Sequence, residues 1–106
     1  MSDSETELLV ERMQSLGESF RRLRLAENVS QETLAARADV GLSTLKRLER
    51  GEGCNLSALV QLLESLAYAD QFESFFAQLA ENASKRDSSL PESRRRASSP
   101  RPRESR

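Results

Sequence analysis

The stretch from residue 30 to residue 51 constrains the fold of this chain more than any other part of it. It reads S-Q-E-T-L-A-A-R-A-D-V-G-L-S-T-L-K-R-L-E-R-G, with apolar residues at helical spacing on both sides of a turn at 39–41. Two short helices joined by three residues must cross steeply, and Ala35 is small enough to lie at the crossing. We expect the core beneath these helices to contain Leu34, Ala38, Leu45 and Leu48.

Caps and turn residues agree with this interpretation. Ser30 is a good N-cap, because its hydroxyl can accept a hydrogen bond from an N–H group of the first helical turn. Val40 is expected to fill the turn from below. The turn needs a residue with positive φ, which glycine adopts without strain and Asp tolerates better than most residues. Asp39 occupies that place, so we expect it to be left-handed.

Helical periodicity continues on both sides of this stretch. A first helix is predicted after a cap at Ser4 or Thr6, with a bend at Gly17. Asn55 is predicted to cap a fourth helix, and Asp70 a fifth. No segment shows the alternation of a strand, and no internal repeat is present. The sequence therefore predicts an all-α fold of five helices.

An aromatic group lies on the predicted fifth helix and just before it. Its members are Tyr68, Phe72, Phe75, Phe76 and Leu79. Adjacent Phe75 and Phe76 cannot face the same way, because successive helical residues lie about 100° apart. The simplest interpretation is a core that packs the last helix. The alternative is a homodimer interface built by this helix, to which Leu8, Leu9 and Met13 of the first helix are further candidates.

A shift in composition divides the 106 residues. Residues 84–106 contain one Leu, three Pro and no aromatic residue, so they cannot bury enough apolar surface to offset the entropy of ordering. We predict an N-terminal helical extension at 1–16, one small helical domain at 17–83 that contains the motif at 30–50, and a disordered tail at 84–106. The tail carries eight basic and three acidic residues, whereas the rest of the chain is acidic. It is interpreted either as a mobile solubilising end or as a segment that binds DNA phosphates or an acidic protein.

Several classes of function are disfavoured. The chain has no His and a single cysteine, Cys54, so it offers neither a zinc site nor an internal disulfide nor a nucleophile with a base beside it. We expect no enzyme and no cofactor. No apolar run approaches the roughly 20 residues that a membrane span needs, and the acidic start differs from a secretory leader. A cytoplasmic protein without a membrane partner is expected.

The outer face of the second helix of the motif predicts contact with double-stranded DNA. Residues 20–50 hold seven basic and four acidic residues, so a local positive patch is expected on an acidic domain. A helix fits the major groove, where Arg can bind guanine, Ser can bind several bases and Leu can contact a thymine methyl group. The candidates for base contact are Leu42, Ser43, Lys46 and Arg47. The candidates for phosphate contact are Gln31, Thr44 and Arg50.

Three alternative interpretations remain open at this point. The motif could be an αα-hairpin used for packing alone. Arg47 could contact a phosphate, or be merely solvated, rather than contact a base. Leu42 could fill the core between helices rather than face the groove.

Residues 20–66 resemble the lambda-repressor/Cro-like (XRE-type) helix-turn-helix family. The matching segments are F-R-R-L-R, S-Q-E-T-L-A, S-T-L-K-R-L-E-R-G and N-L-S-A-L-V-Q-L-L. The resemblance implies a five-helix lambda-repressor-like domain that binds an inverted-repeat operator as a homodimer, and a buried structural ion pair between Arg24 and Glu49. Asp39 replaces the family's usual turn glycine, and Gly41 replaces its usual Ser or Thr cap.

A weaker resemblance concerns the segments E-R-G-E-G-C-N-L and S-L-A-Y-A-D-Q-F-E-S-F-F. They are similar to HipB-like regulators encoded beside HipA-type kinase toxins, including the three-gene HipBST arrangement. The resemblance implies a bacterial, nucleoid-associated repressor of its own toxin–antitoxin operon, with a HipA- or HipT-type kinase toxin or its antitoxin as partner. Alternatively, the main role would be to bind or help neutralise the toxin. The β-strand that dimerises the two-gene HipB proteins has no counterpart here.

Overall fold

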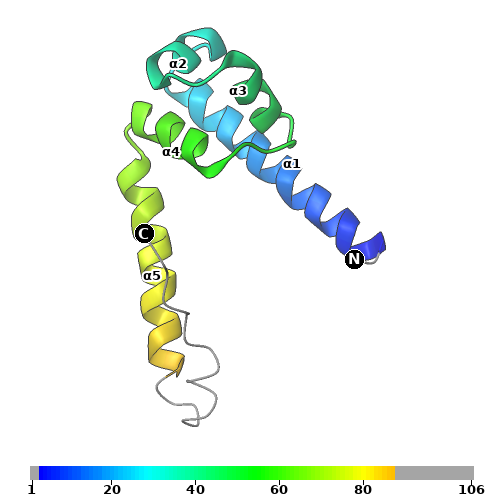
Figure 1. The fold of residues 1–106 in the computed structure, drawn as a ribbon, viewed down its shortest axis with the longest axis vertical. Coiled ribbons are helices and arrows are strands. Elements are labelled where there is room, and N and C mark those ends of the chain that lie inside the picture. Colours follow the sequence, from blue (N-terminus) through cyan, green and yellow to red (C-terminus); the bar gives the residue numbers. More distant parts are fainter. Residues whose placement is uncertain (1–2, 88–106) are drawn as a thin grey trace, which may run out of the picture. The chain divides into compact units, whose positions relative to one another are not determined.

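The computed structural model describes residues 3–87 as five helices without a strand among them. These are α1 (Asp3–Ala26), α2 (Gln31–Ala38), α3 (Leu42–Glu49), α4 (Leu56–Ser65) and α5 (Ala69–Asp87) (Figure 1). The predicted all-α, five-helix fold is confirmed. None of these helices is long and apolar enough to cross a membrane.

Side-chain caps fix the starts of two helices as predicted. Ser30 Oγ accepts a hydrogen bond from the Thr33 amide at 3.1 Å at the start of α2. Asn55 Oδ1 accepts from the Ala58 amide at 2.7 Å at the start of α4. Each bond satisfies one of the amides that a helix leaves without a partner in its first turn.

Three predicted boundaries differ from the structure. α1 begins at Asp3, so Ser4 and Thr6 lie inside it rather than capping it. α5 begins at Ala69, which places Asp70 in its first turn, where a carboxylate favours the helix dipole without being the cap. α5 also continues to Asp87 and therefore includes residues 84–87, which the composition had assigned to the tail. The rest of the predicted disordered tail, residues 88–106, lies outside the described residues.

α1 runs unbroken through Gly17, so this residue does not interrupt the helix. Gly17 is buried where α1 meets the end of α3. A Cβ atom at this position would lie 2.5 Å from the Leu48 carbonyl oxygen and 2.8 Å from that of Glu49. The glycine therefore permits close helix–helix approach, and packing against α3 overrides its weak helix propensity.

The described residues divide into two units between Asp70 and Gln71. In the first unit, α2 packs against α3 and α4, and α1 packs against α3. Leu34, Leu45 and Leu62 are fully buried at its centre. The other apolar core residues are Phe20, Ala35, Ala38, Leu48, Ala58, Leu63 and Leu66. All five residues expected in the core of the motif, including Ala35 at the crossing, are thus buried.

A further hydrogen bond joins two ends of helices within the first unit. Tyr68 Oη, between α4 and α5, donates to Glu27 Oε2 at 2.6 Å, just after α1. The hydrogen bond to this carboxylate raises the pKa of the Tyr68 hydroxyl. It ties the segment that follows α4 to the end of the first helix.

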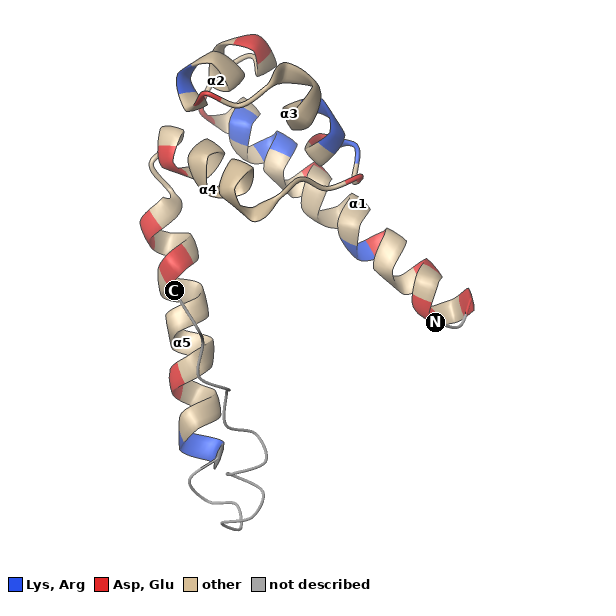
Figure 2. Ribbon diagram, viewed as in Figure 1, with Lys and Arg blue, Asp and Glu red and all other residues tan. Residues whose placement is uncertain are grey.

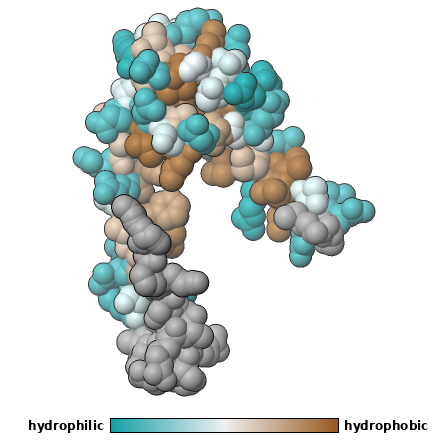
Figure 3. Space-filling model, in the orientation of Figure 1, coloured by the Kyte–Doolittle hydropathy of each residue, from teal (hydrophilic) through white to brown (hydrophobic). Residues whose placement is uncertain are grey.

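Several large apolar side chains remain exposed, and they gather mainly along the N-terminal part of α1 and on α5 (Figure 3). On α1 they include Leu8, Leu9, Val10 and Leu16. On α5, Phe75 is 58% exposed and Phe76 is 56% exposed. Both phenylalanines are therefore exposed, whereas the sequence led us to expect one of the two to be exposed unless a partner covers it.

Candidate nucleic-acid interface

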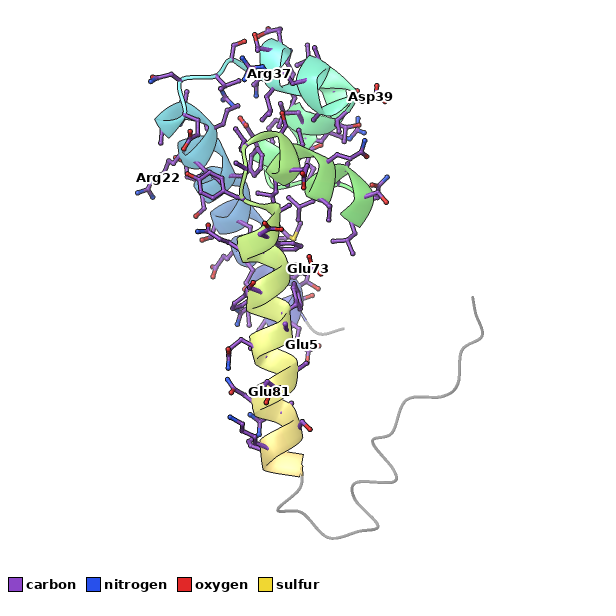
Figure 4. The ribbon with its side chains drawn as sticks, turned by 90° about the vertical axis from the view of Figure 1, so that its left-hand side faces the viewer. Glu5, Arg22, Arg37, Asp39, Glu73 and Glu81 are labelled. Carbon is purple, nitrogen blue, oxygen red and sulfur yellow. The ribbon has the colours of Figure 1, made fainter. Side chains whose placement is uncertain are left out.

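A tight turn joins α2 to α3 and sets the angle between them. Asp39 follows α2 in the left-handed conformation, with φ 57° and ψ 44°, as predicted. The Val40 amide donates to the Ala35 carbonyl at 3.0 Å, and the Asp39 amide to that of Ala36 at 3.3 Å. These bonds satisfy carbonyl groups at the end of α2, as in other left-handed helix ends. The Asp39 side chain points outward at the turn (Figure 4).

Gly41 is the N-cap of α3 and supplies no side-chain hydrogen bond. Its φ of −61° and ψ of 141° are open to any residue, so its backbone does not require glycine. The nearest atom to an added Cβ would be Thr44 Oγ1 at 3.7 Å, which is ordinary van der Waals contact. The start of α3 is therefore held by backbone groups alone, through the Gly41 carbonyl, which accepts from the Thr44 and Leu45 amides.

The outward face of α3 brings together four of the predicted contact residues. Ser43, Lys46, Arg47 and Arg50 are all exposed, and their spacing places them on one side of the helix. Leu45 and Leu48 on the opposite side are buried in the core. Basic residues lie toward the C-terminal end of α3 (Figure 2), so the positive charge of the motif is concentrated on its exposed side.

Leu42 and Thr44 lie at the two borders of this face. Both are half-buried, so each is accessible from one side while it also packs against the domain. Arg47 Nη2 donates to Thr44 Oγ1 at 3.4 Å. Thr44 therefore lies within hydrogen-bonding reach of the Arg47 guanidinium, a relation that sequence spacing alone did not predict.

Arg50 is the C-cap of α3, and its guanidinium pairs with the Glu52 carboxylate at 3.0 Å. Both side chains are more than half exposed. The hydrogen bond from Arg50 lowers the pKa of Glu52, and the same bond raises the pKa of Arg50. Such exposed pairs contribute little to stability. Breaking the ion pair with Glu52 would therefore cost little free energy if Arg50 bound a phosphate group instead.

α3 is also anchored on its buried side. Arg24 of α1 donates through Nε to Glu49 Oε2 at 2.7 Å and through Nη2 to Glu49 Oε1 at 2.9 Å. The side chains are 7% and 4% exposed. Hydrogen bonding to Glu49 raises the pKa of Arg24. The structure thus contains the ion pair that the family resemblance implies, and this pair joins α1 to the last turn of α3.

Two further groups complete this buried arrangement. Arg24 Nη1 donates to the Val29 carbonyl at 2.8 Å, and Gln31 Nε2 donates to Glu49 Oε1 at 3.0 Å. Gln31 was predicted as a phosphate contact. In the structure its amide nitrogen is committed to Glu49, and its position at the first residue of α2 is thereby fixed relative to α3.

Sequence reasoning missed three residues of this site. The roles of Glu52 beside Arg50 and of the Val29 carbonyl depend on loop geometry that no spacing rule predicts. Gly17 contacts α3 across 31 residues of sequence, and its only signal was a glycine inside an otherwise helical pattern.

In this structure α3 packs across α2 and exposes Ser, Lys and Arg on its outer side. Helix-turn-helix proteins place a helix of this kind in the DNA major groove. Residues 15–71 match the model of a helix-turn-helix domain family, and this match covers more than half of the chain. The chain therefore belongs to the helix-turn-helix domain family, whose fold is that of a DNA-binding regulator. No curated protein and no solved structure matches the chain.

Proposed function

We propose that this protein is a transcriptional repressor that binds an inverted-repeat operator as a homodimer and controls its own operon. The observation that carries the proposal is the exposed face of α3, where Ser43, Lys46 and Arg47 lie together on a helix anchored from behind by Glu49. A helix that is exposed on one side and fixed on the other can enter the groove without losing its own support.

The residues of this face have distinct roles in the proposal. Arg47 donates two hydrogen bonds to a guanine, Ser43 and Lys46 contact neighbouring bases, and Leu42 packs against a thymine methyl group. Thr44 and Arg50 bind phosphates, and Gln31 does so through the second N–H of Nε2, since only one N–H of this group donates to Glu49. Because the domain is acidic outside this patch, specificity rests on these few contacts rather than on bulk charge.

The operator follows from the two-fold geometry of such dimers. Two recognition helices enter successive major grooves about 34 Å apart, so half-sites are separated by one helical turn of DNA. The sequence resemblance supports assignment to the XRE-type family and, within it, to HipB-like regulators of a toxin–antitoxin operon. In this proposal the protein acts in the bacterial cytoplasm, has no enzymatic activity, and has a HipA- or HipT-type kinase toxin or its antitoxin as partner.

Footprinting of the full-length protein on the DNA upstream of its own gene tests the proposal. We expect two protected half-sites one helical turn apart and reduced transcription from that promoter. Absence of protection at concentrations that saturate a selected binding sequence would contradict autoregulation. Protection of only one half-site would contradict binding of a dimer to an inverted repeat.

A second candidate function is toxin binding, with the DNA-binding domain serving mainly to control dosage. The exposed apolar residues of α5, which the helix-turn-helix core does not use, favour the presence of a protein-binding surface. Co-purification of the products of the neighbouring genes with the tagged full-length protein distinguishes the two functions. A stable stoichiometric complex with a neighbouring gene product that persists without operator DNA supports toxin binding.

A further inference from the structure

An acidic side chain lies at the basic C-terminal end of α3 (Figure 2). Glu52 follows this helix, and its carboxylate accepts hydrogen bonds from two nitrogens of the Arg50 guanidinium, at 3.0 Å from Nε and 3.5 Å from Nη2. Both side chains are more than half exposed. Arginine binds carboxylates and phosphates through the same pair of N–H groups. The Glu52 carboxylate therefore lies where a DNA phosphate would bind Arg50.

The backbone fixes the position of this acidic residue. The Gly51 amide donates to the Leu48 carbonyl at 3.0 Å. The Glu52 amide donates to the Arg47 carbonyl at 2.9 Å. With Gly51 at a positive φ of 89°, these two bonds form the Schellman motif that ends many helices. A Cβ atom on Gly51 would lie 2.9 Å from the Gln14 Cα atom, so the turn packs closely against α1. Glu52 is therefore fixed to the end of α3.

The charge of Glu52 opposes the positive charge of the candidate interface. The hydrogen bond from Arg50 is the main cause that lowers the pKa of Glu52, and the charges of Arg50 and Arg47 act in the same direction. The carboxylate is therefore ionised at neutral pH. Glu49 is buried and paired with Arg24, so its charge is already compensated on the inner side of the helix. Glu52 thus reduces the positive charge that DNA meets at Arg50.

We propose that Glu52 acts as an internal mimic of a DNA phosphate, which occupies the Arg50 guanidinium in the free protein and is displaced when Arg50 binds the DNA backbone. The inference rests on the proposed contact between α3 and DNA and adds a residue that limits the strength of that contact. A phosphate contact carries no sequence information, so the competition lowers the affinity for every sequence by about the same factor. A larger share of the affinity for an operator then comes from base contacts.

Replacing Glu52 with glutamine tests the proposal, because E52Q keeps the shape of the side chain and removes its charge. E18Q is the matched control. Glu18 pairs with Arg21 at 3.5 Å, and both side chains are at least half exposed, but this pair lies on α1. Fluorescence anisotropy of the full-length variants over a series of salt concentrations gives the affinities for two duplexes. One duplex has a random sequence, and the other carries a binding sequence selected from a random pool.

We expect E52Q to bind both duplexes about two- to fivefold more tightly at low salt, because exposed ion pairs have free energies of this size. The slope of log affinity against log salt concentration should steepen by up to about 0.9, the share of one phosphate contact. E18Q should match the unmodified protein. Binding by E52Q no tighter than by E18Q would overturn the proposal. A gain on the selected sequence alone would also overturn it, because Glu52 would then face a base.

The double variant R50A/E52Q tests whether Glu52 acts through Arg50. If the carboxylate competes for this guanidinium, E52Q should gain little affinity once Arg50 is absent, so the two substitutions should be non-additive. An equal gain with and without Arg50 would show that Glu52 repels DNA directly. That result would overturn the proposed competition.

NMR titration of the Glu52 carboxyl group follows the displacement itself. Its pKa should be lowered in the free protein and should rise in the complex with either duplex. The rise is expected because the carboxylate loses its hydrogen bond from Arg50 and then lies near phosphates of like charge. A pKa that stays lowered in the complex would show that Arg50 still holds Glu52, which would overturn the proposal.

These outcomes separate the inference from the proposed function. If R50A weakens DNA binding while E52Q changes nothing, the DNA interface stands and the role of Glu52 is rejected. If E52Q binds both duplexes more tightly but the protein does not protect its own promoter, autoregulation alone is rejected. Failure of the unmodified protein and of E52Q to bind either duplex would reject both.

Discussion

Arg24 and Glu49 form a bidentate ion pair that joins the first helix to the last turn of the recognition helix. Neither side chain is more than 7% exposed, so the pair is screened little by solvent. The exposed side of α3 and its buried support are thus adjacent in sequence, because Glu49 points inward while its neighbours Arg47 and Arg50 point outward.

Breaking this pair on one side should destabilise the domain strongly. R24A leaves the Glu49 carboxylate buried with only Gln31 as a partner, so we expect a loss of about 3–5 kcal/mol in the free energy of unfolding. Urea titration followed by circular dichroism measures it. The double variant R24M/E49L should recover most of the loss, because it removes both charges together. A loss below 1 kcal/mol in R24A would contradict the inferred importance of the pair.

Gly17 should resist substitution although it lies in the middle of a helix. G17A would ordinarily stabilise an exposed helix by about 1 kcal/mol. Here the added Cβ would meet backbone carbonyl oxygens of α3, so we expect destabilisation of about 1–3 kcal/mol. S15A, at an exposed position of the same helix, is the control and should change little. Thermal unfolding of both variants distinguishes close packing from propensity.

Replacing Asp39 with glycine should stabilise the domain. Its left-handed backbone costs a residue with a Cβ more than it costs glycine, and its negative charge lies at the unfavourable end of the α2 dipole. We therefore expect D39G to raise the free energy of unfolding by about 0.5–1 kcal/mol. D39A removes the same charge but keeps a Cβ, so its free energy of unfolding should be lower than that of D39G. Equal stability of the two would mean that charge rather than backbone conformation limits the turn.

Cys54 should react slowly with alkylating reagents at neutral pH. Burial raises the pKa of its thiol, and a backbone hydrogen bond from Leu59 opposes this shift. Because the reactive species is the thiolate, we expect a rate below that of a small cysteine peptide and a rate profile displaced to higher pH. Because folding raises the pKa of Cys54, the contribution of this thiol to the free energy of unfolding is fully present below its unfolded-state pKa. That contribution is lost as pH rises through the folded-state pKa. A rate equal to that of the peptide across the pH range would contradict this assignment.

Local rules were sufficient for the parts of the fold that local chemistry determines. The caps Ser30 and Asn55 and the left-handed Asp39 follow from side-chain hydrogen bonding and allowed backbone angles, and the structure has all three. Local rules do not predict the role of Gly17, because its close contact with α3 is visible only in the folded structure.

The candidate site likewise contains residues that helical spacing predicts and contacts that it does not predict. Helical spacing placed Ser43, Lys46 and Arg47 on one face, and the structure has them exposed together. The pairing of Arg50 with Glu52 and of Gln31 with Glu49 depends on where flexible side chains meet across a loop or between helices. Periodicity carries no signal for such contacts.

The proposal that α3 reads bases through Arg47 is tested most directly by comparing R47A with R50A on a selected operator and on random DNA. Fluorescence anisotropy at one fixed salt concentration gives the four affinities relative to the unmodified protein. We predict that R47A loses about 1–3 kcal/mol on the operator, loses much less on random DNA, and relaxes the preference at one base position. R50A should lose the same amount on both, as a phosphate contact does. Equal losses of R47A on operator and random DNA would contradict the assignment of Arg47 as a base-reading residue.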